Sequence, residues 1–491
     1  MGPETIRHFI GGKYAYSSLR KSYGVTDPAT GKEYAQVEVG LGADVNQAVL
    51  AAGTALESGP WPATRAPERA GALLAMADAI DARAGDIAAA EAQGPGLPVT
   101  ASGEQAARAS AAFRAAARLI AGEAGLIAGE AGLRLSRPAG VAGLVTSWRT
   151  PFLAQARAVA PALAAGATVV LRPDERAPRP AALLAEIAIA AGLPGGVLNI
   201  VHGSLHRKAP GAQSRDELVA HPAVARLSFA GEAAAWQQVA TAATARGKPL
   251  SAEVAGNCPV VIFADADLDQ AIDAVLFGAF AAGGQRRTAT STVLVHQPVY
   301  ERVVSRLAER AGRIRAGDPA DPATQVGPLP HADQLGQLTS FIRLSIREGA
   351  LLAAGGRRPA GLPEGNYLAP TVLAGVTPDM PGFAGPAGGP VLRVTPFGSE
   401  AEAVALANAT AHPATAYLWT ADQARARRLA IAFAAASTWV NSCNQADLVH
   451  PTAARPVAAG GAGAIGFYAE SRTVLIAADD APVPRLGACM F

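Results

Sequence analysis

Cysteine is scarce in this chain, and the few cysteines exclude two classes of protein. Cys258, Cys443 and Cys489 are the three cysteines among 491 residues, so a disulfide framework is not expected. They form no C-x-x-C pair and the eight histidines show no ligand spacing, so a metal site is unsupported. We therefore expect a protein of the reducing cytoplasm, without structural metal.

Long apolar runs and a charge excess of one sign are lacking too. The most apolar stretch, residues 181–203, is interrupted by Glu186, Gly192 and Pro194, so no membrane span is expected. The first residues lack the apolar core of a secretory signal peptide. The 42 Lys and Arg nearly balance the 40 Asp and Glu and are scattered, so neither nucleic acid nor a membrane is an expected partner.

What the chain has is an alternation of short apolar runs and helical periodicity, which begins near residue 140. Strands separated by single helices predict an α/β fold with a parallel, doubly wound sheet. A second series of the same kind follows Gly256, and the length exceeds that of one core, so two α/β domains are expected. The strands predicted in the first series are 140–146, 168–173, 197–203, 226–231 and 249–256, and the Gly- and Pro-rich segments 94–104, 355–366 and 378–390 are expected to be loops.

Within this frame, a series of short motifs resembles the aldehyde dehydrogenase superfamily in the family's order. The match runs from about residue 9 to the 470s, and it is the order that makes the resemblance specific. Its motifs include FIGGKY (9–14), SWRTPF (147–152), LRPDE (171–175), GGQRRT (283–288) and TWVNS (438–442).

The resemblance implies three structural parts. A Rossmann-like cofactor-type domain would comprise residues 1–124 and 145–253, and a second, catalytic-type α/β domain would comprise 254–450. An oligomerisation flap would comprise 125–144 and 467–491, so the likeness implies a homo-oligomer or an oligomer with an active relative. Because a fold does not by itself establish an activity, the site residues require separate consideration.

The residues at the family's catalytic positions depart from its chemistry. The family holds its nucleophilic cysteine in a Gly-Gln-x-Cys-Thr motif, and here Arg287 stands at that position. A guanidinium stays protonated and forms no thiohemiacetal, so the chain is identified as a divergent member that lacks the catalytic cysteine. Arg149 stands where the family has the Asn of its oxyanion hole. Glu253 keeps the position of the general base, and we expect it to neutralise Arg287 or Arg149.

The resemblance also implies a partly degraded nucleotide site. Arg172 and Glu175 match the family's ribose-binding Lys and Glu, and Trp148 precedes the altered oxyanion position. Gly231 begins the turn that approaches the pyrophosphate, but Glu232 follows it with a negative charge. We therefore expect no tightly bound cofactor, and NAD or NADP if there is any.

Two further losses concern the ends of the dinucleotide. Trp236 replaces the second glycine of the pyrophosphate turn, where the lack of a side chain matters. Pro386 stands at the carboxylate of the nicotinamide-ribose clamp. Changes at nucleophile, oxyanion hole and cofactor site together indicate that selection on the chemistry has been released.

Three functional hypotheses remain open. The first is a catalytically inactive protein kept as an assembly subunit, alone or with an active dehydrogenase or another pathway enzyme. The second is an aldehyde oxidoreductase with relocated chemistry, in which Cys443, in a loop that lines the substrate tunnel in relatives, replaces the lost thiol and Glu253 remains the base. The third is an anion-binding module that uses Arg149, Arg286 and Arg287 in the old tunnel.

Overall fold

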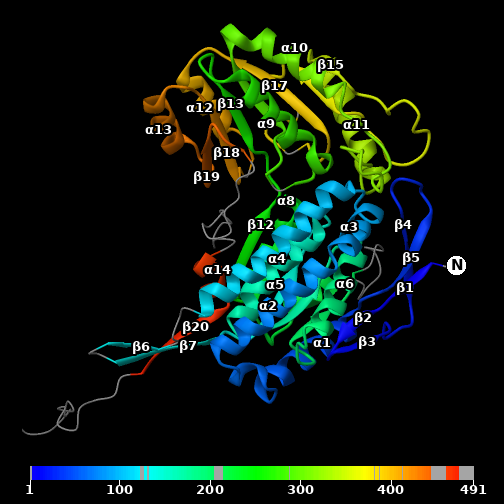
Figure 1. The fold of residues 1–491 in the computed structure, drawn as a ribbon, viewed down its shortest axis with the longest axis vertical. Helices are drawn as coiled ribbons and strands as arrows, with labels where there is room; N and C mark the ends of the chain where they lie inside the picture. The colour runs from blue at the N-terminus through cyan, green and yellow to red at the C-terminus, as the bar shows by residue number, and fades with distance from the viewer. Residues whose placement is uncertain are drawn as a thin grey trace, which may run out of the picture.

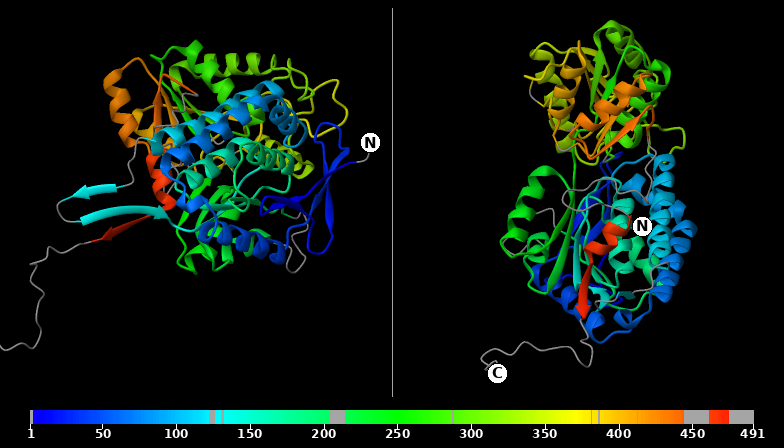
Figure 2. Two further views of the ribbon diagram at one scale, coloured as in Figure 1. Left: turned by 60° about the horizontal axis from the view of Figure 1, so that its bottom comes forward. Right: turned by 90° about the vertical axis from the view of Figure 1, so that its left-hand side faces the viewer.

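The computed structural model has two α/β lobes and a projecting β arm (Figure 1). The first lobe holds the N-terminal half of the chain up to β12, and the second lobe holds strands β13 to β19. The arm leaves the first lobe at its far end, where it is the most extended part of the fold (Figure 2). The structure describes residues 3–121, 126–129, 132–203, 214–286, 288–380, 382–385, 387–411, 413–443 and 461–474.

The first lobe is built on a seven-stranded sheet in the order β12-β11-β8-β9-β10-β2-β3. The five strands from β12 to β10 are parallel, and β2 and β3 extend the sheet as an antiparallel hairpin. The predicted doubly wound sheet is therefore confirmed. Its strands are β2 (His8–Ile10), β3 (Lys13–Ala15), β8 (Val141–Val145), β9 (Thr168–Arg172), β10 (Leu198–Ile200), β11 (Val224–Gly231) and β12 (Leu250–Val254).

Burial of both faces explains why these strands are continuous apolar runs rather than alternating ones. In β9, Val169 and Leu171 face one core while Val170 between them faces the other. One face is covered by α2 (Ala66–Ala82), α3 (Ala84–Gln93), α4 (Val99–Ala121), α5 (Pro151–Ala164) and α6 (Pro178–Ala190), and the other by α1 (Gly42–Glu57), α7 (Ser214–Ala220) and α8 (Ala233–Thr244).

A small sheet of β1 (Glu4–Ile6), β5 (Glu33–Glu38) and β4 (Ser22–Thr26) flanks the first lobe. The prediction that residues 94–104 form a loop is wrong for residues 99–104. Residues 99–104 form the first turns of α4, because Pro98 ends the preceding loop and its carbonyl accepts a hydrogen bond from the Ser102 amide at 3.0 Å. Proline is tolerated just before a helix, so a Pro-rich stretch marks its start as readily as a loop.

The second lobe has its own seven-stranded sheet in the order β15-β16-β17-β14-β13-β18-β19. Val261 and Leu294 face one core while their strand neighbours face another, so this sheet too is buried on both sides. Its strands are β13 (Pro259–Ile262), β14 (Thr292–His296), β15 (Leu351–Ala354), β16 (Thr371–Ala374), β17 (Val391–Phe397), β18 (Thr415–Trp419) and β19 (Ser437–Val440), and its helices are α9 (Leu268–Phe280), α10 (Tyr300–Ala311), α11 (Ala332–Arg347), α12 (Glu400–Asn408) and α13 (Gln423–Ala432).

The arm is a three-stranded antiparallel sheet made by two distant parts of the chain. Strand β7 (Gly132–Pro138) pairs with β6 (Leu126–Gly129) on one side and with β20 (Ala469–Val474) on the other. Helix α14 (Gly461–Phe467) leads into β20. Residues 475–491 of the expected flap lie outside the described residues. The domain and flap boundaries given above stay predictions.

The order of the strands in the first sheet fixes where a ligand site forms. From β8 the chain moves outward to β9 and β10 and then returns to β11 on the other side of β8. The loops that follow β8 and β11 therefore diverge and leave a crevice at the carboxyl ends of these two strands. Residues 146–150 follow β8, and Glu232 follows β11. The candidate site residues of the first lobe meet at this crevice.

Candidate active site and cofactor cleft

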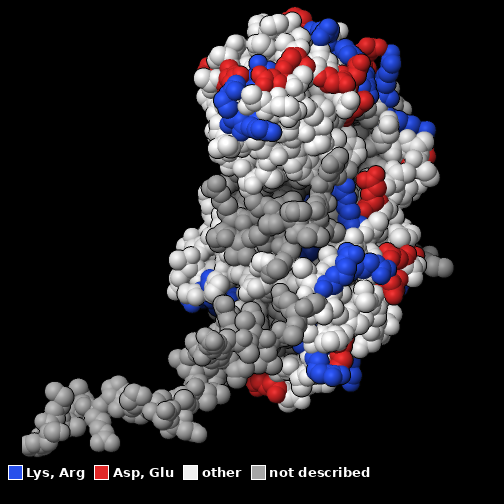
Figure 3. Space-filling view, turned by 60° about the vertical axis from the view of Figure 1, so that its left-hand side comes forward, with Lys and Arg blue, Asp and Glu red and all other residues white. Residues whose placement is uncertain are grey.

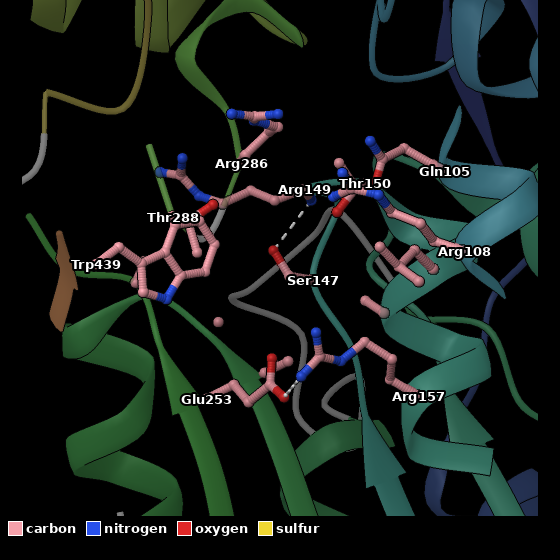
Figure 4. Close-up of a pocket in the computed structure, with 15 residues that line it drawn as sticks. Gln105, Arg108, Ser147, Arg149, Thr150, Arg157, Glu253, Arg286, Thr288 and Trp439 are labelled. Carbon is pink, nitrogen blue, oxygen red and sulfur yellow. Dashed lines mark hydrogen bonds and ion pairs between the residues drawn. The ribbon is translucent and has the colours of Figure 1, made fainter. Parts of the chain in front are cut away.

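A cavity lies beyond the carboxyl ends of β8, β11 and β12, and arginine dominates its wall (Figure 4). Arg108 comes from α4 and Arg157 from α5, while Arg149 and Arg286 come from the loops after β8 and after the short 3-10 helix η2 (Ala281–Gly284). Glu253 of β12 is the one carboxylate among the described lining residues. The structure thus brings Arg149 and Glu253 to one cavity and adds two arginines that sequence reasoning missed.

Glu253 is paired with Arg157, a partner that was not expected from the sequence. The Nη2 atom of Arg157 donates to Oε1 of Glu253 at 3.3 Å, and both side chains are about one-fifth exposed. The expected partner Arg287 lies outside the described residues. Arg157 lies about one and a half turns after the start of α5. Because the SWRTPF motif begins this helix, the helical periodicity could have predicted that the Arg157 side chain points toward the same end of the sheet.

Arg149 extends across the indole of Trp148 rather than toward Glu253. Its guanidinium carbon lies 4.6 Å from the centre of the Trp148 ring, a cation–π distance. An added Cβ on Gly388 would lie 3.3 Å from Nη2 of Arg149, so the guanidinium reaches the 387–389 segment of the second lobe. Burial lowers the pKa of Arg149, and Glu232 opposes that shift. The side chain thus lies between the tunnel and the cofactor side of the crevice.

The loop that carries the family's nucleophile position keeps its tight geometry. Ala282, Gly283 and Gly284 have positive φ angles of 54°, 64° and 69°. A Cβ on Gly284 would meet the carbonyl oxygen of Gly389 at 2.5 Å, so this position requires glycine. Arg286 is 8% exposed and packs with its guanidinium 4.2 Å from the Phe277 ring centre. Arg286, expected to contribute to an anion site, does line the cavity.

Cys443, the candidate substitute thiol, follows β19 in the second lobe. The described lining of the cavity includes Trp439 of β19 and not Cys443, and the role of Cys443 as a substitute thiol stays a prediction. Instead Cys443 packs against the core of the second lobe as a partly buried side chain. Burial raises the pKa of its thiol, with Arg286 opposing, so the neutral thiol is favoured over the reactive thiolate.

A second, more polar cleft lies on the other side of Trp148, where the motifs place the ribose site. Arg172 at the end of β9 donates to Glu175 at 2.7 Å. Trp148, Arg172, Glu175 and Gly231, the four residues expected in the cofactor site, all line this cleft. The indole of Trp148 is buried and also carries Arg176 at 5.3 Å from its ring centre. The structure therefore brings these four residues to one cleft, and their role in binding a cofactor stays a prediction.

Arg176 also lines this cleft, although no sequence motif pointed to it. It donates to Asp174 at 2.6 Å and lies 3.1 Å from Nε2 of His331, which begins α11 of the second lobe. It thus ties the two lobes together across the crevice. Its position could have been noticed in the sequence, because Arg176 directly follows the LRPDE motif (171–175). A charged side chain next to the end of that strand faces the same cleft.

The start of α8 carries a negative charge where a phosphate would approach. Glu232 is the N-cap residue of α8 and is exposed. A carboxylate interacts favourably with the positive end of a helix, and for the same reason it competes with an anionic ligand there. Trp236, one turn later, tilts against Phe229 with ring centres 6.1 Å apart. Pro386 of the nicotinamide clamp lies outside the described residues.

Other classes of site are not found in the part of the chain that the structure describes. No group of three His, Cys, Asp or Glu side chains within it is placed to hold a metal ion. No described helix combines the length and the apolar composition that crossing a bilayer requires. On the face drawn in Figure 3, basic and acidic residues are interspersed, without the single-sign patch typical of a nucleic-acid surface.

The fold and the crevice define a Rossmann-like α/β protein of the oxidoreductase type. The chain belongs to the aldehyde dehydrogenase family, whose model matches residues 14–464. This confirms the family predicted from the motifs.

Two relatives that are named after an enzymatic activity match this chain over nearly their full length. The chain is 39% identical over 456 residues to 5-carboxymethyl-2-hydroxymuconate semialdehyde dehydrogenase of Escherichia coli, covering 91% of this chain and 94% of that protein. It is 34% identical to 2-hydroxymuconic semialdehyde dehydrogenase of Pseudomonas sp. CF600, covering 96% and 99%.

Solved structures confirm the fold at high similarity. HpcC from Thermus thermophilus superposes with a TM-score of 0.92 at 36% identity, covering 99% of this chain and 95% of that one. Betaine aldehyde dehydrogenase from Staphylococcus aureus in complex with NAD+ superposes with a TM-score of 0.93 at 26% identity, covering 98% and 96%. The scaffold is thus that of proteins crystallised with the dinucleotide.

Proposed function

We propose that this chain is a catalytically inactive member of the aldehyde dehydrogenase family, kept as an assembly subunit of the cytoplasm that pairs with itself or with an active relative. The observation that carries the proposal is Arg287 at the position of the family's nucleophilic cysteine. Oxidation by the family's route needs a thiolate that attacks the carbonyl carbon, and a guanidinium supplies no such electron pair. Glu253, the one retained catalytic position, is engaged by Arg157.

The cofactor cleft supports the same proposal from a different side. Its adenosine end fits a ribose through Arg172 and Glu175, but the rest of a nicotinamide dinucleotide fits poorly. Glu232 places a carboxylate at the start of α8, and Arg149 reaches toward Gly388, in the segment where the nicotinamide ribose would be held. We expect the dissociation constants of NAD and NADP to exceed roughly 1 mM, which corresponds to a binding free energy of less than about 4 kcal/mol. Micromolar binding by calorimetry would mean that the site is in use.

Assembly is supported by the arm, which needs no active-site residue. Among the described strands, β20 is at one edge of the three-stranded sheet and pairs with β7 alone, which leaves its other side for a partner. An edge strand of this kind invites pairing with a second chain. Light scattering of the full chain and of a chain that ends at Tyr468, before β20, tests this. We expect the full chain to form a dimer or a larger species and the shortened chain to be a monomer. A full chain that is monomeric would refute the assembly proposal.

The rival is an NAD(P)-dependent oxidoreductase with relocated chemistry, favoured by the names of the relatives, which are semialdehyde and betaine aldehyde dehydrogenases. It requires Cys443 as nucleophile and Glu253 as base. The raised pKa of the Cys443 thiol and its packing against the core speak against that role. Cys443→Ala distinguishes the two proposals, because it abolishes turnover under the rival and changes nothing under ours.

A further inference from the structure

The second sheet has an edge strand that carries no charge. Strand β15 (Leu351–Ala354) is at the end of the strand order opposite to β19, and among the described strands it pairs with β16 alone. Figure 1 places it at the outer margin of the second lobe, on the side away from the arm. Its sequence Leu-Leu-Ala-Ala has neither the charged residues nor the proline with which edge strands commonly prevent pairing with another chain.

Large apolar side chains are exposed along this edge. Leu351 is 66% exposed and Leu352 is 38% exposed, and Ile346, near the end of α11 and just before the strand, is 41% exposed. Among the described residues of the second lobe, Ile431 is the one other large apolar side chain that is exposed. Three of these four side chains therefore belong to one short segment, and removing them from water would favour association.

A residue of each sign flanks the apolar strand. Glu348 precedes it as the C-cap residue of α11 and Arg357 follows it; both are exposed, and neither forms an ion pair within the described part of the chain. Arg347 belongs to the last turn of α11, where a base complements the helix dipole. Arg358 is engaged by three backbone carbonyl oxygens of the following loop. An edge with an acid at one end and a base at the other is complementary to its own copy in antiparallel orientation.

We propose that two copies of this chain pair through β15, antiparallel and about a twofold axis at the middle of the strand. Leu351 of one copy then lies opposite the partner's Ala354, and Glu348 approaches the partner's Arg357. The two seven-stranded sheets become one continuous sheet across both molecules. Because of the twofold axis, each of these contacts occurs twice.

This pairing is weak by itself and is strengthened by the arm. The strand has four residues, and its register with β16 shifts between Leu352 and Ala354, so the edge offers few regular ladder positions. Molecules that are already joined through the arm present several such edges at once, which raises the overall affinity. The inference therefore rests on the proposed assembly role and deepens it: the arm forms the smaller assembly, and β15 joins two of these into a larger one.

Sedimentation velocity of the full-length chain and of Leu351→Lys at equal concentration tests the pairing. We expect the unmodified chain to have about twice the mass of the variant, because a lysine on an edge strand opposes pairing. Leu50→Lys is the matched control, since Leu50 is 60% exposed and lies on α1 of the first lobe. It should keep the larger mass. An unchanged mass in Leu351→Lys, or an equal loss in Leu50→Lys, would overturn the proposal.

Exchange of the flanking charges tests the antiparallel geometry. Glu348→Arg and Arg357→Glu each place like charges at both ends of the pair, and each should raise the dissociation constant of the larger assembly about tenfold. The double variant restores opposite signs and should recover the mass of the unmodified chain. Single variants without effect, or a double variant that stays small, would refute pairing of β15 with its own copy and leave the edge to a different partner.

The chain that ends at Tyr468 separates this inference from the proposed assembly role. A full-length chain that matches Leu351→Lys in mass but exceeds the shortened chain would defeat the β15 pairing and leave assembly through the arm intact. A full-length chain that is a monomer would defeat both.

Discussion

Arg149 lies with its guanidinium carbon 4.6 Å from the centre of the Trp148 ring, directly after the strand that leads into the crevice. The contact holds a cation between the tunnel and the cofactor cleft. A long charged side chain at this place changes two sites at once, because it adds positive charge to the tunnel and reaches the segment around Gly388.

Restoring the nucleophile alone should not restore activity. In Arg287→Cys the thiol returns to its family position, but Arg149 and Glu232 remain in the crevice. We expect turnover of the single variant to stay at background in an assay of reduced-nicotinamide absorbance. The added cysteine should nonetheless react with a thiol reagent, which serves as the control that it is accessible. A single variant with clear aldehyde-dependent turnover would show that the cofactor site is intact.

The pairing of Arg157 with Glu253 should stabilise the fold measurably. Both groups are about one-fifth exposed, so Arg157→Gln leaves a largely buried carboxylate with less compensation. We expect a loss of about 1–2 kcal/mol in the free energy of unfolding. Arg114→Gln is the matched control, because Arg114 makes exposed ion pairs with Asp78 and Asp81 and should cost less than about 0.5 kcal/mol. Equal losses in the two variants would contradict a special role for the Glu253 pair.

Acid should destabilise the first lobe through two buried histidines. His8 and His202 stack with ring centres 5.9 Å apart, and burial lowers their pKa values to about 4 and about 3. Below pH 6.5 the unfolded chain takes up protons that the folded chain does not, so stability falls as the pH falls. We expect the thermal midpoint to drop between pH 6.5 and 4, and the drop to be smaller in His202→Gln. A midpoint independent of pH in this window would rule out the account.

Glu91 should have the opposite pH dependence. Its side chain is buried, accepts a hydrogen bond from the Phe152 amide at 2.9 Å, and has its pKa raised to about 7 by burial. The stability that the neutral carboxyl contributes is therefore present below pH 4.5 and is lost as the pH rises through 7. Glu91→Gln keeps an acceptor without the charge. We expect it to raise stability by about 1–2 kcal/mol at pH 8 and to have little effect at pH 5.

The parallel sheets could be predicted because burial on both faces leaves a clear record in the sequence. Runs such as TVVLR in β9 have no polar face, and the interposed helices have lengths that favour crossover connections. The beginning of α4 could not be predicted, because Gly and Pro near Pro98 suggest a loop up to Gly103. Where α4 begins depends on tertiary contacts, which the local sequence pattern does not contain.

The candidate site divides in the same way. Arg149, Glu253, Arg172 and Glu175 were found because family motifs fix their places at strand ends. Arg157 and Arg108 were missed, since they lie within helices whose exposed and cavity-facing turns look alike in the sequence. The side to which the Cys443 thiol points could not be predicted, because a loop after β19 has no periodicity that would fix it.

Steady-state turnover of the unmodified, full-length chain is the most direct test of the central claim. The purified protein is mixed with NAD or NADP and with aliphatic, aromatic and carboxylate-bearing aldehydes, and reduced-nicotinamide absorbance is followed. The account predicts no aldehyde-dependent increase, because Arg287 supplies no nucleophile. An aldehyde-dependent increase that disappears in Cys443→Ala would contradict it and establish relocated chemistry.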